Sequence, residues 1–405
     1  MAAADSPSAS GIYLLHQARS FSALPGRDGT GPLLAELATA PCPFSAALAD
    51  RPLALYGAGN LGRMARDFLR NVGHDFVLAV DRNAETLASD AGWAGVEMLH
   101  PDNVTESAKT GVRLAVSIVS SPYVPIERSL RAIGFGDVVP FYDLTESFRH
   151  LHPLSNGWFA PTLTGDEIAN TAAVLARWDD DVSRAHHLQF LAWRRLRQEW
   201  SFAPAPVTSG DRFFIPEVTA LMHDRESLVD AGGHHGSVIE AFLARTHGRF
   251  RQIAAFEPDP ANRAALEQCV AKRVPDHPNV AIYDFALADE QGEASFHDGL
   301  GYASQLSATG RLRVRTQPLD ALALAPSFVK LHVEGGELAA LQGARETLLE
   351  YRPIIATTIY HNADGIWRTP LWLMETLPDY RFLLRNHSWC GTGSVVYAIP
   401  RERRA

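Results

Sequence analysis

Short apolar runs alternate with longer segments of helical periodicity, and this alternation begins twice along the chain. Residues 53–56 form an apolar run that leads through a glycine-rich turn into a helical pattern over residues 63–72. The same order recurs where the apolar run 227–230 leads through the glycine-rich turn 231–236 into the helical pattern 237–245. A strand, a glycine-rich turn and a helix in this order open a doubly wound sheet that binds a nucleotide at the turn. The pattern therefore predicts an α/β protein with two Rossmann-like units.

The spacing of these patterns divides the chain into four parts. A chain of 405 residues suits two or three domains, and a stretch rich in Pro, Gly and Ser at residues 202–210 is typical of a linker. We predict a flexible N-terminal arm over residues 1–45 with a short helix at 33–37, a small Rossmann-like domain of nucleotide-binding type over 46–150, a helical linker over 151–210, and a catalytic domain over 211–405 whose mostly parallel sheet ends in an antiparallel hairpin. Two histidines and three arginines of the linker are expected on its solvated face: His186, His187, Arg194, Arg195 and Arg197.

Composition and charge narrow the range of partners. The formal net charge is −9 and there is no basic run, which argues against a nucleic-acid footprint. Three widely spaced cysteines give no disulfide framework and suit a reducing compartment. The N-terminus lacks the features of a signal peptide, and no apolar stretch is long enough to span a membrane. We expect a cytoplasmic protein with no membrane partner, and the sequence leaves its oligomeric state open.

The first glycine-rich turn resembles a dinucleotide fingerprint. Gly57, Gly59 and Gly62 fit the pattern G-x-G-x-x-G, and Asp81 ends the next apolar run nineteen residues later. An acidic residue at that distance binds a ribose hydroxyl in such sites. The segment is nevertheless too short for two mononucleotide-binding halves, and it lacks a catalytic pair for hydride transfer. Two interpretations stay open, a nucleotide or nucleotide-sugar site and a scaffold that binds nothing, with the second slightly favoured.

The second glycine-rich turn follows an acidic residue and predicts a different ligand. Asp230 precedes the glycines and would repel a pyrophosphate, but it would attract the ammonium and sulfonium groups of S-adenosylmethionine. Glu257 ends the next apolar run, where a carboxylate can accept both ribose hydroxyls of an adenosine. Each acid alone could simply cap the following helix, but together they indicate an S-adenosylmethionine site. The predicted cofactor-binding residues are Asp230, Gly232, Gly236, Glu257, Asp284 and Phe285.

A third group of polar residues ends two later strands. In the predicted strand 329–334, Lys330, His332 and Glu334 face one way, although a parallel strand of a doubly wound sheet is normally apolar on both faces. His361 ends the next predicted strand. One hypothesis makes a histidine the general base for a hydroxyl, with Lys330 and Glu334 beside it, while Lys330 paired with Glu334 is the structural alternative. The other hypothesis, which is possible but not favoured, is a divalent metal held by His332, Glu334, His361 and Asp364.

These segments resemble the FkbM-type methyltransferases. The matching motifs are V-D-A-G-G-H-H-G at 229–236, F-E-P-D-P at 256–260, A-L-A-D at 286–289, T-Q-P-L-D at 316–320, V-K-L-H-V-E-G-G-E at 329–337, L-Q-G-A at 341–344 and R-P-I-I-A at 352–356. A bacterial subgroup of this family has a small Rossmann-like domain and a helical linker before the methyltransferase, so the resemblance extends more weakly over nearly the whole chain. One departure is His332, where the family usually has Asp, which puts any role of that Asp in doubt.

The resemblance implies methyl transfer from S-adenosylmethionine, mostly to hydroxyl oxygens. We therefore expect an O-methyltransferase that acts on a small-molecule or glycan acceptor, such as a sugar or a secondary metabolite. Two alternatives differ in class. One is a nicotinamide- or nucleotide-sugar-dependent enzyme that uses the first Rossmann-like unit, and the other is a non-catalytic nucleotide-binding scaffold.

Overall fold

The N-terminal unit is a small doubly wound sheet. The computed structural model describes residues 14–152, 154, 158–275 and 277–404. Five parallel strands lie in the order β4-β3-β2-β5-β6. Their bounds are Leu53–Tyr56 for β2, Leu78–Val80 for β3, Met98–Leu99 for β4, Arg113–Val116 for β5 and Asp137–Pro140 for β6. The helices of this unit are α2 (Asn60–Asn71), α3 (Ala84–Leu87), α4 (Glu106–Gly111), α5 (Tyr123–Ala132) and α6 (Phe141–Thr145). The order reverses beside β2, which makes the β2–β5 edge the topological switch point.

The C-terminal unit is a larger sheet of seven strands, in the order β10-β9-β8-β15-β16-β18-β17. The first five are parallel, and β18 runs antiparallel to both of its neighbours, β16 and β17, which gives the predicted terminal antiparallel hairpin. Their bounds are Ser227–Ala231 for β8, Gln252–Phe256 for β9, Val280–Tyr283 for β10, Phe328–Leu331 for β15, Ile354–Thr358 for β16, Tyr380–Asn386 for β17 and Ser394–Pro400 for β18. Here the switch point lies between β8 and β15.

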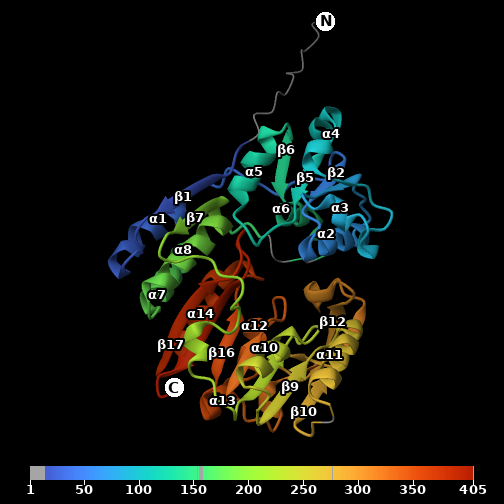
Figure 1. Cartoon of the computed structure of the whole chain (residues 1–405). Coiled ribbons are helices and arrows are strands. Elements are labelled where there is room, and N and C mark those ends of the chain that lie inside the picture. The colour runs from blue at the N-terminus through green and yellow to red at the C-terminus, as the bar shows by residue number, and fades with distance from the viewer. Residues whose placement is uncertain (1–13, 153, 155–157, 276, 405) are drawn as a thin grey trace, which may run out of the picture.

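Helices and a small second sheet complete the C-terminal unit. The helices are α9 (Pro216–Thr219), α10 (Ser237–Arg245), α11 (Pro260–Arg273), α12 (Glu337–Gln342), α13 (Arg345–Tyr351) and α14 (Arg368–Thr376). The small sheet has the order β11-β14-β12-β13, with bounds Ala286–Leu287 for β11, Gly292–His297 for β12, Gln305–Leu306 for β13 and Leu312–Gln317 for β14. In Figure 1 the two units lie one above the other, with the helical linker beside them. Across the described ranges, no helix is long and apolar enough to cross a membrane.

The predicted loose arm is wrong for the part that the structure describes, and residues 1–13 lie outside the described residues. Strand β1 (Gln17–Phe21) pairs in parallel with β7 (Gln198–Phe202), which follows the linker helices. Helix α1 (Thr30–Thr39) contains the predicted short helix and buries Leu34 and Leu37 in the main core. The segment is ordered because β7 offers an unpaired edge and because α1 has apolar residues to bury, neither of which overall composition reveals.

The expectation of a solvated linker face is also wrong. The linker contains α7 (Gly165–Arg177) and α8 (Asp181–Leu196), and α8 runs between α1, β7 and β17. All five polar residues expected on its surface are at most 2% exposed: His186, His187, Arg194, Arg195 and Arg197. They are tolerated because each reaches hydrogen-bond acceptors on neighbouring segments. Arg195 donates to the carbonyl oxygen of Ala160, for example, and His187 contacts that of Ile366.

Candidate active site

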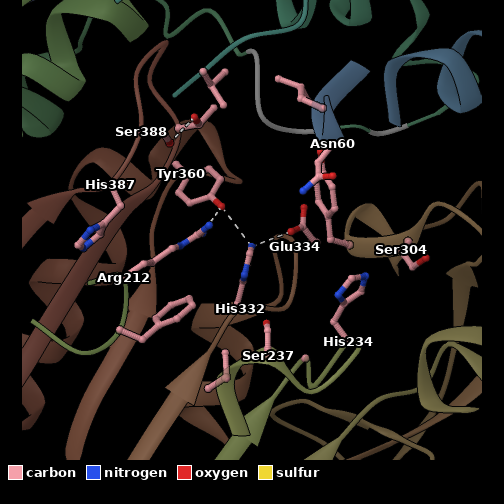
Figure 2. Close-up of a pocket in the computed structure, with 18 of the residues that line it drawn as sticks. Asn60, Arg212, His234, Ser237, Ser304, His332, Glu334, Tyr360, His387 and Ser388 are labelled. Atoms are coloured by element: carbon pink, nitrogen blue, oxygen red, sulfur yellow. Dashed lines mark hydrogen bonds and ion pairs between the residues drawn. The ribbon is translucent and has the colours of Figure 1, made fainter. Parts of the chain in front are cut away.

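One cavity of about 1200 Å³ lies between the two units. Its lower wall is formed by residues at the carboxyl ends of β8, β9 and β15, and its upper wall by residues that follow β2, β3 and β5. Figure 2 shows side chains of both units that line this space, with Asn60 entering from the upper one. Ligands of open α/β sheets bind outside the carboxyl ends of the strands. The cavity therefore joins the two ligand edges that the glycine-rich turns predict.

The glycines of the second turn are required by the fold. Gly232 has φ +77°, and a Cβ there would lie 2.0 Å from the carbonyl oxygen of His332. Gly236 has φ +86°, and a Cβ there would lie 2.7 Å from Sγ of Cys269. Both positions combine a left-handed backbone with a lack of space, which suits glycine. Gly232 lines the cavity, whereas Gly236 lies behind it among the packed residues of the turn.

Asp230 and Lys330 form a buried ion pair behind the turn. Register places them opposite each other on β8 and β15, and Lys330 Nζ lies 2.9 Å from Asp230 Oδ1. Lys330 also donates to the carbonyl oxygens of Ala231 at 3.1 Å and Gly232 at 2.7 Å. Asp230 is fully buried and is not among the described residues that line the cavity. The pair thus positions the turn, and Lys330 bonds to Asp230, not to Glu334 as the structural alternative supposed.

Glu257 and Phe285 occupy positions that suit an adenosine, but Asp284 does not. Glu257 follows β9, lines the cavity and accepts hydrogen bonds from the backbone N–H of His234 at 2.7 Å and of Asp259 at 3.0 Å. Burial raises the pKa of Glu257 to about 7. Phe285 is buried and lines the cavity. Asp284 is more than half exposed, pairs with Arg315 and is not among the described residues that line the cavity, so the structure does not bring it to the predicted adenine position. Neighbouring residues of an extended segment face opposite ways.

A charged cluster borders the cavity at the ends of β15 and β16. His332 Nε2 lies 2.9 Å from Glu334 Oε1, and the same oxygen lies 3.3 Å from His361 Nε2. His361 Nδ1 contacts Glu337 Oε1 at 2.6 Å. His332 and Glu334 line the cavity (Figure 2), while the side chain of His361 is fully buried beneath them. Of the two histidines predicted as a base, only His332 is therefore within reach of a ligand.

The pKa values of the cluster follow from this geometry. Burial lowers the pKa of His332 to about 3, so its imidazole is neutral at pH 7. Burial opposes ionisation of Glu334, but His361 and His332 hold the pKa of that carboxyl far below its usual range. For His361, burial favours the neutral form, yet Glu334 and Glu337 keep its pKa well above the ordinary value. At neutral pH the imidazole of His332 is therefore neutral. Beside it, the His361 imidazolium lies between the carboxylates of Glu334 and Glu337.

Three of the four predicted metal ligands come together. The ligand atoms of His332, Glu334 and His361 all lie within 4.8 Å of one another. Asp364 stays outside this group and pairs with Arg368 at 2.8 Å. A guanidinium group also lies close to the cluster, because Arg212 donates to Tyr360 Oη, which lies 3.1 Å from His332 Nε2.

Residues 230–387 match the model of the methyltransferase FkbM domain. The C-terminal unit contains an FkbM methyltransferase domain. The resemblance predicted from the motifs is thereby confirmed. The match ends at His387, so the FkbM domain includes the second glycine-rich turn, Glu257 and the whole charged cluster, while the N-terminal unit lies outside it. No curated protein sequence matches the chain significantly.

Solved structures show how far the fold is shared. The chain is similar to the methyltransferase FkbM from Methylobacillus flagellatus KT, with a TM-score of 0.60 at 18% sequence identity over 93% of this chain and 94% of that chain. An rRNA methylase from Streptococcus thermophilus gives a TM-score of 0.30 at 14% identity over 45% and 90% of the two chains. For precorrin-6y C5,15-methyltransferase from Geobacter metallireducens GS-15 the TM-score is 0.30 at 16% identity over 49% and 95%. The first likeness covers both units, so the N-terminal unit and the FkbM domain occur together in that fold.

Sequence reasoning missed three residues of the site. Glu337 closes the V-E-G-G-E motif and accepts from Thr358, from two backbone N–H groups and from His361, so it fixes the orientation of His361. Tyr360 directly precedes His361, and alternation along the strand end could have indicated that it faces the cavity. Arg212 gave no local signal, because it comes from the loop after the linker and reaches Tyr360 only in the folded chain.

Proposed function

We propose that the FkbM domain transfers a methyl group from S-adenosylmethionine to a hydroxyl oxygen, on a sugar, a glycan or a secondary metabolite. The observation that carries the proposal is that Glu257, at the end of β9, and His332, at the end of β15, line one cavity. Two lone-pair sites of the Glu257 carboxylate are used by backbone N–H groups, and others are left for ribose hydroxyls. Phe285 offers an aromatic edge or face to adenine.

His332 is the residue we propose as general base. Glu334 is ionised, so we infer that His332 Nε2–H donates to Glu334 Oε1 and that Nδ1 keeps the free electron pair. When bound, S-adenosylmethionine supplies a methyl group on a positively charged sulfur. As the methyl carbon–sulfur bond breaks and the carbon–oxygen bond forms, His332 takes the hydroxyl proton, and Glu334 stabilises the resulting imidazolium. The residues around the cavity must hold the two reacting atoms roughly 3–3.5 Å apart.

A metal-assisted reaction is the alternative that the cluster allows. We favour the base because Arg212 already places a positive charge beside Tyr360 and His332, where a second cation would be repelled. His361 is also held on both sides by carboxylates, which suits an imidazolium better than a metal ligand. Dialysis against a chelator is expected to leave the methylation rate unchanged. Loss of activity that a divalent cation restores would favour the metal.

Removing the Glu257 carboxylate tests the proposed donor site. Calorimetric titration of the wild-type chain with S-adenosylmethionine and S-adenosylhomocysteine should show binding, whereas NAD and NADP should not compete. Hydrogen bonds to a charged group contribute about 1.5–3 kcal/mol, so Glu257→Ala is expected to weaken S-adenosylhomocysteine binding by about 10- to 150-fold. Glu267→Ala, on an exposed position of α11, is the matched control and should bind normally. Normal binding by Glu257→Ala would overturn the proposed donor site.

The raised pKa of Glu257 predicts how donor binding depends on pH. Only the ionised carboxylate accepts hydrogen bonds from both ribose hydroxyls, and burial raises the pKa of Glu257 to about 7. Below pH 7, Glu257 must therefore lose a proton before the ligand binds. The affinity for S-adenosylhomocysteine should then fall by about tenfold for each pH unit below 6. Titrations from pH 5 to pH 7.5 measure this slope. In Glu257→Gln the slope should vanish, and an equal slope in that variant would assign it to another group.

A further inference from the structure

A second ligand edge faces the donor turn across the same cavity. It belongs to the N-terminal unit and lies at the topological switch point between β2 and β5. The wall is formed by residues after three parallel strands: Gly57, Gly59, Asn60 and Leu61 after β2, Asp81, Arg82 and Asn83 after β3, and Ser117 to Ser121 after β5. This is the place where an open α/β sheet binds its ligand. The cavity volume of about 1200 Å³ also exceeds the roughly 300–1,000 Å³ typical of a site for a single small molecule.

The three glycines of the first turn differ in what the fold requires of them. Gly57 has φ +98°, and a Cβ there would lie 2.6 Å from Cγ1 of Ile118. At Gly62 a Cβ would lie 2.1 Å from the carbonyl oxygen of Gly57. Gly59, by contrast, has φ −72°, and apart from the adjoining chain no described atom lies within 4 Å of a Cβ placed there. The fold would accept a side chain at Gly59, so its absence leaves the backbone open to a ligand in the cavity.

The groups around Gly59 suit a nucleotide diphosphate. Helix α2 begins directly after Gly59, and within the described residues no side chain caps this end. The neighbouring helix α5 differs, because Glu199 accepts from the N–H groups of Tyr123 and Val124 at its start. Free N–H groups at a helix start bind phosphate oxygens. The carboxylate of Asp81 accepts from the backbone N–H of Ala58 at 2.7 Å and of Asn83 at 2.8 Å, and its remaining lone pairs can accept from a ribose.

We propose that the N-terminal unit binds the methyl acceptor, and that this acceptor is a nucleoside diphosphate sugar. The diphosphate would lie against Gly59 and the start of α2, the ribose against Asp81, and the sugar would extend toward His332. This inference rests on the proposed function, because it assigns the lower wall to the methyl donor. A dinucleotide fits less well, since it needs a second mononucleotide-binding half where the FkbM domain forms the opposite wall.

The test separates the two ligand edges by titration. UDP-glucose, GDP-mannose, dTDP-glucose and NAD are titrated into the full chain, with and without S-adenosylhomocysteine, and each variant is also titrated with S-adenosylhomocysteine alone. Gly59→Val places a branched side chain in the open space before α2. Gly111→Val is the matched control, because this glycine also has open space for a Cβ but ends α4 outside the cavity lining. Circular dichroism spectra of both variants are compared with that of the wild type to check that they fold.

We expect at least one of the sugar nucleotides to bind, Gly59→Val to weaken that binding by tenfold or more, and Gly111→Val to bind normally. S-adenosylhomocysteine binding should be unchanged in both variants. The inference is overturned if the wild-type chain binds S-adenosylhomocysteine but none of the three sugar nucleotides, if NAD alone binds, or if Gly59→Val binds sugar nucleotides normally. Binding of a sugar nucleotide without any S-adenosylhomocysteine binding would instead overturn the proposed function.

Discussion

Replacing His332 with alanine should lower kcat for methyl transfer by about 10²-fold, the lower end of the range for a positioned general base, because its low pKa makes the imidazole a weak base. His332 is the histidine of the charged cluster that lines the cavity, and its neutral imidazole is the form that accepts a proton. The binding of S-adenosylhomocysteine should stay within threefold of the wild type, because Glu257 and the donor turn are untouched. Single-turnover rates and calorimetric titration measure the two quantities separately. His100→Ala, a partly exposed histidine of the N-terminal unit, is the control.

Two further variants separate the base from its positioning residue. In Glu334→Gln the imidazole loses the carboxylate that fixes its proton on Nε2, so kcat should fall less than in His332→Ala and its pH profile should shift. His332→Asp keeps a side chain that can accept a proton and should therefore keep more activity than His332→Ala. Wild-type turnover in His332→Ala would show that His332 is not the general base. Alignment of the two reactants would then account for the catalysis.

The residues that sequence reasoning placed correctly are those whose position depends on local order. Gly232 and Glu257 follow strands directly, and strand ends of a parallel sheet meet at one edge, so their positions in the cavity follow from the pattern of apolar runs. His332 was found in the same way, as a polar residue directly after a buried strand. Asp284 lies outside the cavity lining because adjacent residues of an extended segment face opposite ways, and the sequence did not show which of Asp284 and Phe285 points inward.

Interactions between distant segments could not be predicted. The ion pair of Asp230 and Lys330 joins strands a hundred residues apart and depends on the register of β8 with β15. The pairing of β1 with β7 depends on an edge that exists only once the linker helices are in place. Likewise, the cavity belongs to neither unit alone. The sequence could therefore favour an N-terminal scaffold that binds nothing, although the fold places its first glycine-rich turn opposite the second one across this cavity.

Buried arginines of the linker bond to both units: Arg197 to Asp143 of the N-terminal unit, and Arg194 to the carbonyl oxygen of Gly391 in the C-terminal unit. Arg197 is fully buried, and its Nε donates to both carboxylate oxygens of Asp143 on α6 at 3.0 and 3.1 Å. Removing one partner of a buried ion pair leaves the other charge without its counterion, which costs about 3–5 kcal/mol. We expect Asp143→Ala to lower the free energy of unfolding by about this amount, measured by urea denaturation. Asp224→Ala, at an exposed pair with Arg249, should change it by less than about 1 kcal/mol.

A double variant shows whether the effect comes from the isolated charge or from the loss of packing. In Asp143→Leu combined with Arg197→Met, both charges are replaced by apolar groups, and no buried charge is left without a partner. Such replacements are often neutral or stabilising, so the double variant should be more stable than Asp143→Ala. If the double variant is as unstable as Asp143→Ala, the stabilisation comes from the hydrogen bonds of Arg197 to the carbonyl oxygens of Trp193 and Trp158. If Asp143→Ala unfolds like the wild type, this ion pair does not hold the N-terminal unit over the active site.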